Sequence, residues 1–236
     1  MKVRIKFIKQ GPVKFIGHLD IMRYFQKAMR RADVDIKYSE GFNPHQIMSF
    51  AAPLGVGLTS NGEYMDIEVN SMESPTDLMD RLNETMAEGI AVTECHILND
   101  NAKNAMSLVA AADYSLKFRE GKEPEDIEDF LKNFLVFANQ EHIFIMKKTK
   151  KSEKEVDLKA SIYEFRVEDT TIFMKISAGS ADNLKPDLVM EAYDLWRGQD
   201  SETFAFQIQR EEVYGNVGDE ENKIFLPLGR IGEAVE

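Results

Sequence analysis

The fold is indicated most clearly by the stretch KVRIKFIKQGPVKFIGHLDIMRYFQKAMRRA, residues 2–32. At its start, apolar and charged residues alternate, which is the period-two pattern of a half-buried strand. From His18 onward, apolar residues recur every three or four positions, which is typical of an amphipathic helix. Gly17 can serve as its N-cap, and Asp20 in the first turn suits the helix dipole. The stretch therefore predicts a strand followed by a helix that ends near Ala32.

Similar patterns recur further along the chain. Apolar and polar residues alternate in residues 62–69, and residues 90–98 form an apolar run, so both are expected to be strands. Between them, residues 74–89 are typical of a helix, with Ser74 as its N-cap and Pro75 at the first helical position. Two strands with a helix between them are therefore expected in this part of the chain.

The order of the predicted elements indicates the fold class. Residues 1–100 run strand, helix, strand, strand, helix, strand, with residues 34–39 as the second strand and one extra strand from the loop region. That order is the ferredoxin-like split βαβ. The same order recurs in residues 107–215 without sequence identity between the halves. We predict an α+β protein of two ferredoxin-like (βαββαβ) halves packed together, with a C-terminal extension in residues 216–236.

Composition excludes several classes of site. With 43% apolar residues the 236-residue chain can form a core, and no apolar run approaches the length needed to cross a bilayer. The N-terminus has a strand pattern and not that of a signal peptide, so we expect a cytoplasmic protein without membrane contact. The single cysteine, Cys95, excludes an intrachain disulfide and any cysteine-based zinc or iron–sulfur site made by this chain alone. We predict no metal and no cofactor.

Charge is distributed unevenly. Residues 1–60 contain ten Lys or Arg and four Asp or Glu, whereas the whole chain has a net charge of −12. Four cations of the first predicted helix fall in one arc opposite its apolar stripe: Arg23, Lys27, Arg30 and Arg31. This arc is either a contact surface for RNA phosphates or the solvated side of the helix. The segment KKTKKSEKE, residues 147–155, is either a solvated hairpin end or a basic finger for RNA.

The loop YSEGFNPHQIMSF, residues 38–50, is more elaborate than a connection between two strands requires. Gly41 permits a backbone conformation that other residues avoid, and Pro44 fixes its own φ. These two residues are expected to shape the loop. Phe42 is either a core residue or a stacking platform for a base, and Asn43 beside it is a candidate base contact.

Two histidines are candidate catalytic residues. His45 ends the GFNPH motif, and His18 begins the HLD motif at the start of the first helix. In a ferredoxin-like fold the loop can approach that helix start, so the two imidazoles could bracket a phosphodiester as acid and base. A lone histidine near a proline-rich turn is more often a packed ring with structural hydrogen bonds, and this interpretation of His45 stays open beside the catalytic one. No third metal ligand is evident, and the catalytic residues stay unassigned at this point.

The motifs resemble those of a radical-SAM-associated family of unknown function, whose members occur alone or fused behind radical SAM enzymes. The resemblance is carried by residues 15–20 (FIGHLD), by Arg31-Ala32, by residues 38–45 (YSEGFNPH) and by residues 53–64 (PLGVGLTSNGEY). It covers roughly the first third of the chain and implies the stand-alone form. With one cysteine, this chain resembles the associated module and not the radical enzyme, whose cluster needs three.

The chain departs from the family pattern at two places. Gly17 stands where the family usually has serine, and Gln46-Ile47 stands where Pro-Lys or Pro-Arg is expected. The second departure removes one cation from the loop. It therefore argues against phosphate binding by the loop, but not against phosphate binding by the helix.

Three functions remain open from the sequence. The first is a non-catalytic RNA-associated module that presents substrate to, or docks on, a radical SAM enzyme. The second is a metal-independent endoribonuclease that uses His18 and His45. The third is a protein–protein adaptor without a nucleic-acid role, whose acidic second half is the docking face.

Overall fold

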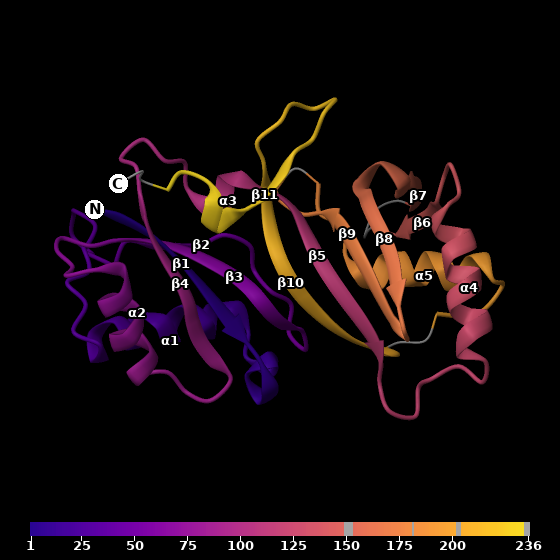
Figure 1. The fold of residues 1–236 in the computed structure, drawn as a ribbon, viewed down its shortest axis with the longest axis horizontal. Coiled ribbons are helices and arrows are strands. Elements are labelled where there is room, and N and C mark those ends of the chain that lie inside the picture. Colours follow the sequence, from indigo (N-terminus) through magenta and orange to yellow (C-terminus); the bar gives the residue numbers. More distant parts are fainter. Residues whose placement is uncertain (149–152, 181, 202–203, 234–236) are drawn as a thin grey trace. The chain divides into compact units, whose positions relative to one another are not determined.

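The computed structural model describes residues 1–148, 153–180, 182–201 and 204–233, and the chain divides into two units. The first unit comprises Met1–Ala111 and Arg210–Glu236, and the second comprises Ala112–Gln209. The α+β class predicted from the sequence is confirmed, since helices accompany a mainly antiparallel sheet (Figure 1). Residues 149–152 of the predicted charged tip lie outside the described residues.

The first unit has the strand order expected of a ferredoxin-like half. Its elements are β1 (Lys2–Lys9), η1 (Gly11–Phe15), α1 (His18–Arg31), β2 (Met48–Phe50), β3 (Thr59–Glu68), α2 (Pro75–Glu84), β4 (Ile90–Leu98), α3 (Ala105–Leu108), β11 (Phe225–Pro227) and η3 (Leu228–Arg230). β1 pairs antiparallel with β3 and with β4, and β2 pairs antiparallel with β3, which gives the order β4-β1-β3-β2. This is the order of a split βαβ.

The core of the first unit lies on one face of this sheet, under α1 and α2. Residues of β1 with side chains on this face, such as Val3 and Ile5, pack against apolar residues of both helices. Phe7 of β1, Phe25 of α1 and Phe50 of β2 form a ring cluster with centroids 4.7–5.9 Å apart. The apolar stripe that predicted α1 is therefore its buried face.

The second unit repeats the strand order. Its elements are α4 (Ile127–Ala138), β6 (Phe144–Lys148), β7 (Glu153–Asp157), η2 (Lys159–Ser161), β8 (Ile162–Glu168), β9 (Thr171–Ser177) and α5 (Pro186–Trp196), with parts of β5 (Val109–Phe118) and β10 (Phe206–Asn216). The sheet order is β10-β5-β9-β8, and β6 and β7 form a separate hairpin. Helices α4 and α5 meet through aromatic rings, with the centroids of Phe134 and Tyr193 5.3 Å apart.

The expected strand at residues 34–39 is reduced to two isolated bridges, from Ile36 to Val69 and from Tyr38 to Gln46. The alternating pattern there reflects one buried side chain, that of Ile36. The flanking Asp35 carboxylate instead accepts hydrogen bonds from Asn70 and Ser71. The second strand of the half is the three-residue β2.

Arg4 organises the other face of the first sheet. Its side chain is 0% exposed, although the flanking residues of β1 point into the core on the opposite face. Nε and Nη2 donate to the Asp66 carboxylate at 2.8 and 3.0 Å. Nη1 donates to the carbonyl oxygens of Leu228 and Ile231, and Nη2 also donates to that of Lys103. All five N–H donors of the guanidinium are thereby used.

This contact fixes two segments that are distant in sequence. The Asp66 carboxylate also accepts from the amide of Ala105 at the start of α3. The carbonyls of Leu228 and Ile231 belong to the C-terminal segment, where β11 pairs with β10. A buried guanidinium is tolerated only with a carboxylate and a full set of acceptors. Arg4 therefore ties both segments to the sheet.

Replacing Arg4 by methionine is expected to destabilise the fold strongly. The variant leaves the Asp66 carboxylate without its positively charged partner in a nearly buried site, which costs about 3–5 kcal/mol of unfolding free energy. Urea denaturation followed by circular dichroism measures the change. Arg23→Met is the matched control, because among the described residues the Arg23 guanidinium pairs only with exposed Asp20, and it should change stability little. Equal stability of both variants would contradict this role of Arg4.

Candidate nucleic-acid interface

The segment before α1 is held by a buried lysine. Lys9 Nζ donates to the carbonyl oxygen of Ile16 at 2.8 Å, and burial lowers the pKa of this amine. Gly17 is the N-cap of α1, as predicted, and offers no side chain for capping. The imidazole of His18 then lies edge-on to the ring of Phe50, with centroids 5.4 Å apart. His18 is thus half-buried against the aromatic core cluster.

Gly62, Glu63 and Tyr64, the GEY end of the motif at residues 53–64, have structural roles. Gly62 lies so close to β10 that a Cβ would stand 2.8 Å from the backbone of Glu211. Next to it, the buried carboxylate of Glu63 binds the buried guanidinium of Arg210 at 2.5 and 2.8 Å. Tyr64 is buried as well, and burial raises the pKa of its hydroxyl. These motif residues join β3 to β10 and are not free to contact a ligand.

The GFNPH loop is closed at its base by Ser39. The Ser39 hydroxyl accepts from the amide of His45 at 3.1 Å and lies 2.9 Å from His45 Nδ1. The Ser39 amide donates to the His45 carbonyl at 2.8 Å. Gly41 has a φ of +108°, and a Cβ there would meet nothing within 4 Å. Glycine is therefore needed for the backbone conformation and not for space.

Phe42 projects from this loop into solvent. Its exposed fraction is 105%, the highest among the exposed large hydrophobic residues in the described ranges. Asn43, Pro44 and His45 beside it are exposed too. Because the Phe42 ring is not buried, it contributes no hydrophobic stabilisation to the fold. Packing therefore does not explain why a phenylalanine stands at this position.

Gln46 attaches the loop to α1. It is 5% exposed, and its Nε2 donates to the carbonyl oxygen of Gln26 at 3.2 Å. Its Oε1 is buried without a hydrogen-bond partner among the described residues. The sequence identified Gln46 only as a departure that removes proline, and no local pattern indicates this anchoring role.

The four predicted cations of α1 differ in their contacts. Arg23 is 69% exposed and lies 3.2 Å from Asp20. Arg31 donates to the Thr85 carbonyl and lies over the Tyr24 ring. Lys27 and Arg30 are exposed and make no side-chain ion pair or hydrogen bond to another described residue. The free positive charge of the arc is therefore concentrated at Lys27 and Arg30, one and four residues from Gln26.

A cavity of about 290 Å³ lies beside His45 on the sheet face opposite α1. Its lining includes Ser49, Asp66 and Asn104. These groups are engaged within the fold, because Asp66 binds Arg4 and the Asn104 amide donates to the Ser49 hydroxyl at 2.6 Å.

His18 does not line the cavity, and its ring packs against Phe50. The described contacts thus bring the loop to α1, and none of them joins His18 to His45. Their use as an acid–base pair stays a prediction.

Residues 2–186 match the model of a family described as an uncharacterized protein conserved in bacteria (DUF2344). The chain belongs to this family. No curated protein matches the sequence. Among solved structures, a chain of the "Crystal Structure of a Cbf5-Nop10-Gar1 Complex" is similar at a TM-score of 0.44 and 10% identity, over 89% of this chain and 48% of that chain. This chain thus spans about half the length of that one, and a likeness at this level carries no inference about function.

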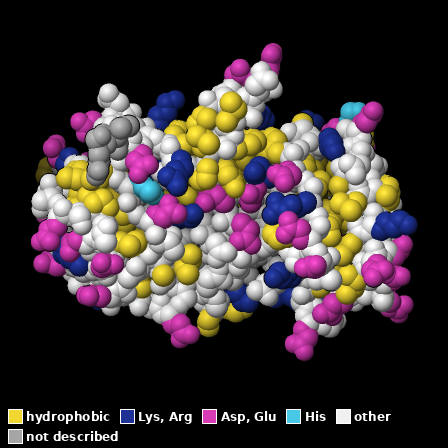
Figure 2. All heavy atoms as spheres, viewed as in Figure 1, with side chains coloured by type: hydrophobic (Ala, Val, Ile, Leu, Met, Phe, Trp, Pro, Cys, Tyr) yellow, Lys and Arg dark blue, Asp and Glu magenta, His cyan; other side chains and the backbone are white. Residues whose placement is uncertain are grey.

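A group of ionisable residues that the sequence did not indicate surrounds Lys6 in this DUF2344 chain. Although burial opposes it, ion pairs with Glu212 and Glu94 at 2.8 and 3.2 Å raise the pKa of Lys6. His96 lies within 2.9 Å of carboxylate oxygens of Glu94 and Glu233. These charges are mutually paired, and Figure 2 shows basic and acidic side chains interspersed on the visible face.

Two further properties bear on the chemistry of the site. Within the described ranges, no three His, Cys, Asp or Glu residues are grouped so that they could hold a metal ion. Burial raises the pKa of the Cys95 thiol to about 12, which disfavours a nucleophilic thiolate.

No helix in the described part of the chain has the length and apolar character needed to cross a membrane.

Two phenylalanine substitutions distinguish the roles of the loop and the core. Phe42→Ala should change the unfolding free energy by less than about 0.5 kcal/mol, because the ring buries no surface. Phe50→Ala should cost about 3–5 kcal/mol, because its ring fills the core between Phe7 and Phe25. Chemical denaturation measures both. A large loss of stability in the Phe42 variant would show that this ring packs in solution.

Proposed function

We propose that this protein is a non-catalytic, cytoplasmic RNA-associated module that presents RNA to, or docks on, a radical SAM enzyme. The observation that carries the RNA part is the fully exposed Phe42 on a loop anchored to the helix that bears Lys27 and Arg30. The radical SAM part rests on the resemblance of residues 15–64 to the family associated with those enzymes.

An aromatic ring next to free cations suits single-stranded RNA. Stacking of a base on an aromatic side chain contributes about 1–3 kcal/mol, and every base has a face that can stack. Lys27 and Arg30 supply phosphate contacts without first losing an internal partner. The Gln46–Gln26 hydrogen bond supports a fixed distance between stacking and phosphate contacts.

Nearby acids limit how far charge alone can account for binding. Glu40 precedes Gly41 in the loop, and Asp20 neutralises Arg23 at the start of α1. The net field at the surface is therefore modest, so stacking by Phe42 should supply a large part of the affinity. Unpaired bases should be preferred over duplex RNA, whose bases are already stacked.

A binding role is favoured over cleavage by the surroundings of the loop. The Nδ1 atom of His45 lies against Ser39, and its described contacts include no second acid or base. A metal-independent nuclease needs both groups within reach of one phosphodiester. The geometry therefore supports recognition by the loop rather than reaction.

The test is fluorescence anisotropy with a fluorescein-labelled single-stranded RNA, titrated at several salt concentrations. Phe42→Ala should weaken binding about fivefold or more with an unchanged salt dependence, because stacking releases no counterions. Lys27→Glu/Arg30→Glu should also weaken binding, and should lower the slope of log K against log salt by about 1.4.

The matched control is Lys132→Glu/Lys185→Glu, which makes the same charge change at exposed lysines of the second unit. It should bind like wild type. Absence of binding by folded wild type at low salt would contradict the proposal, as would equal losses in the control and the helix variant. RNA cleavage in EDTA that Phe42→Ala retains and His45→Ala loses would favour the nuclease instead.

A further inference from the structure

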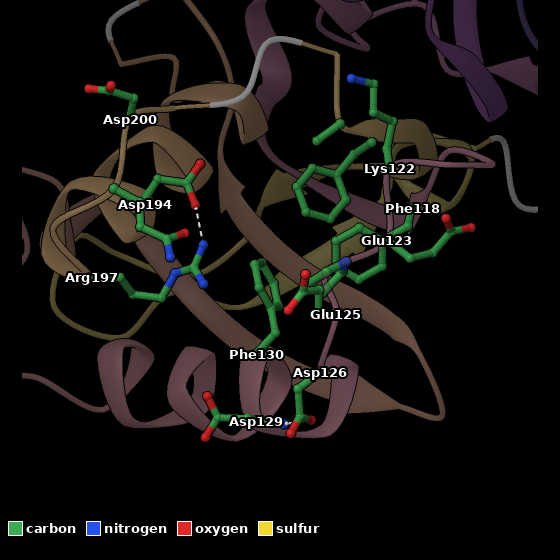
Figure 3. A pocket seen from close by; sticks show the side chains of 14 residues that line it. Phe118, Lys122, Glu123, Glu125, Asp126, Asp129, Phe130, Asp194, Arg197 and Asp200 are labelled. Atoms are coloured by element: carbon green, nitrogen blue, oxygen red, sulfur yellow. Dashed lines mark hydrogen bonds and ion pairs between the residues drawn. The ribbon is translucent and has the colours of Figure 1, made fainter.

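The second unit contains a cavity of about 430 Å³ that the RNA surface does not involve (Figure 3). Its walls come from the end of β5, the loop and first turn that lead into α4, the end of α5 and the start of β10. All of its lining residues belong to the second unit, so its chemistry can be considered separately from the loop at Phe42.

Three phenylalanine rings form the floor of this cavity. The centroid of Phe118 lies 5.1 Å from that of Phe130 and 4.7 Å from that of Phe206. Phe118 and Phe206 are only partly buried, so aromatic surface faces the hollow. Such surface attracts flat or cationic groups that can lie against a ring.

The chain itself places a guanidinium in this environment. Arg197 has its Cζ 4.5 Å from the Phe130 ring centroid, and its Nη2 donates to Asp194 at 2.8 Å. In Figure 3 a dashed line marks the hydrogen bond that joins this guanidinium to the Asp194 carboxylate. An aromatic face and a carboxylate are thus already arranged as a guanidinium requires.

The rim carries more carboxylates than the fold uses. Asp126 caps α4 by accepting from the Asp129 amide, and Asp129 accepts from Asn133. By contrast, Glu123, Glu125 and Asp200 have no side-chain partner among the described residues. Glu125 and Phe130 both line the cavity, and both are labelled in Figure 3.

We propose that this cavity receives an arginine side chain from a basic segment of a partner protein. The guanidinium would lie against the exposed aromatic surface of Phe118 and Phe206 and would be bound by Glu125. Arginine fits better than lysine, because its planar group stacks and forms paired hydrogen bonds with a carboxylate. The lining also contains two cations, Lys122 and Arg197, but its six Asp and Glu residues outnumber them. This net negative charge disfavours phosphate and favours a cationic occupant over nucleic acid.

The test is a titration of the ¹⁵N-labelled full chain, followed by NMR, with N-acetyl-arginine amide. N-acetyl-citrulline amide has nearly the same shape without the charge and serves as the matched ligand. The arginine derivative should shift backbone amides of residues 118–130 and 194–201 in a saturable way, and citrulline should not. Glu125→Gln should weaken binding about fivefold, whereas Glu128→Gln on the exposed side of α4 should not weaken it.

Three outcomes would overturn the proposal. Equal shifts with citrulline would show that charge is not recognised. Shifts spread over acidic surfaces outside the cavity would show non-specific attraction. Absence of saturable binding at low salt would show that the cavity does not take arginine. The proposal does not rest on RNA binding, because Phe42→Ala and Lys27→Glu/Arg30→Glu should leave this titration unchanged.

Discussion

The structure of the first unit depends on the ion pair between Arg4 and Asp66. A guanidinium with no exposed surface is stable only if every donor has an acceptor, and here the acceptors come from three separate segments. The pair therefore does more than link β1 to β3. It requires the chain before α3 and the C-terminal segment near Leu228 to lie on the sheet face that the helices leave uncovered.

This arrangement determines what is left for function. One face of the first sheet is covered by α1 and α2, and the other is crossed by segments tied to Arg4. Of the motif residues, Gly62 and Glu63 join strands, and His18 packs on the core. The GFNPH loop is the exception. Ser39 and Gln46 hold it at its base, while Phe42 remains in solvent.

Part of the fold could be predicted from the sequence, because the signals for helices and their caps are local. Helical spacing of apolar residues predicted α1 to within one residue of its observed end, and Ser74 caps α2 through the amide of Asp77, as its position indicated. The role of Gln46 could not be predicted, because a single buried amide that donates to a helix carbonyl produces no periodic pattern in the sequence. The strand predicted at residues 34–39 was wrong, because apolar and polar residues alternate there although only one of the side chains, that of Ile36, is buried. The aromatic cavity joins Phe118, Phe130 and Phe206, which only the tertiary fold brings together.

The central claim is that RNA meets the protein at Phe42, and photo-crosslinking tests it most directly. Single-stranded RNA containing 4-thiouridine is irradiated with the wild-type protein, and the modified residues are located by mass spectrometry. We expect crosslinks at residues 38–46, with Phe42 the principal site because a stacked base lies in contact with its ring. Reproducible crosslinks confined to other parts of the chain, with none in this loop, would contradict it.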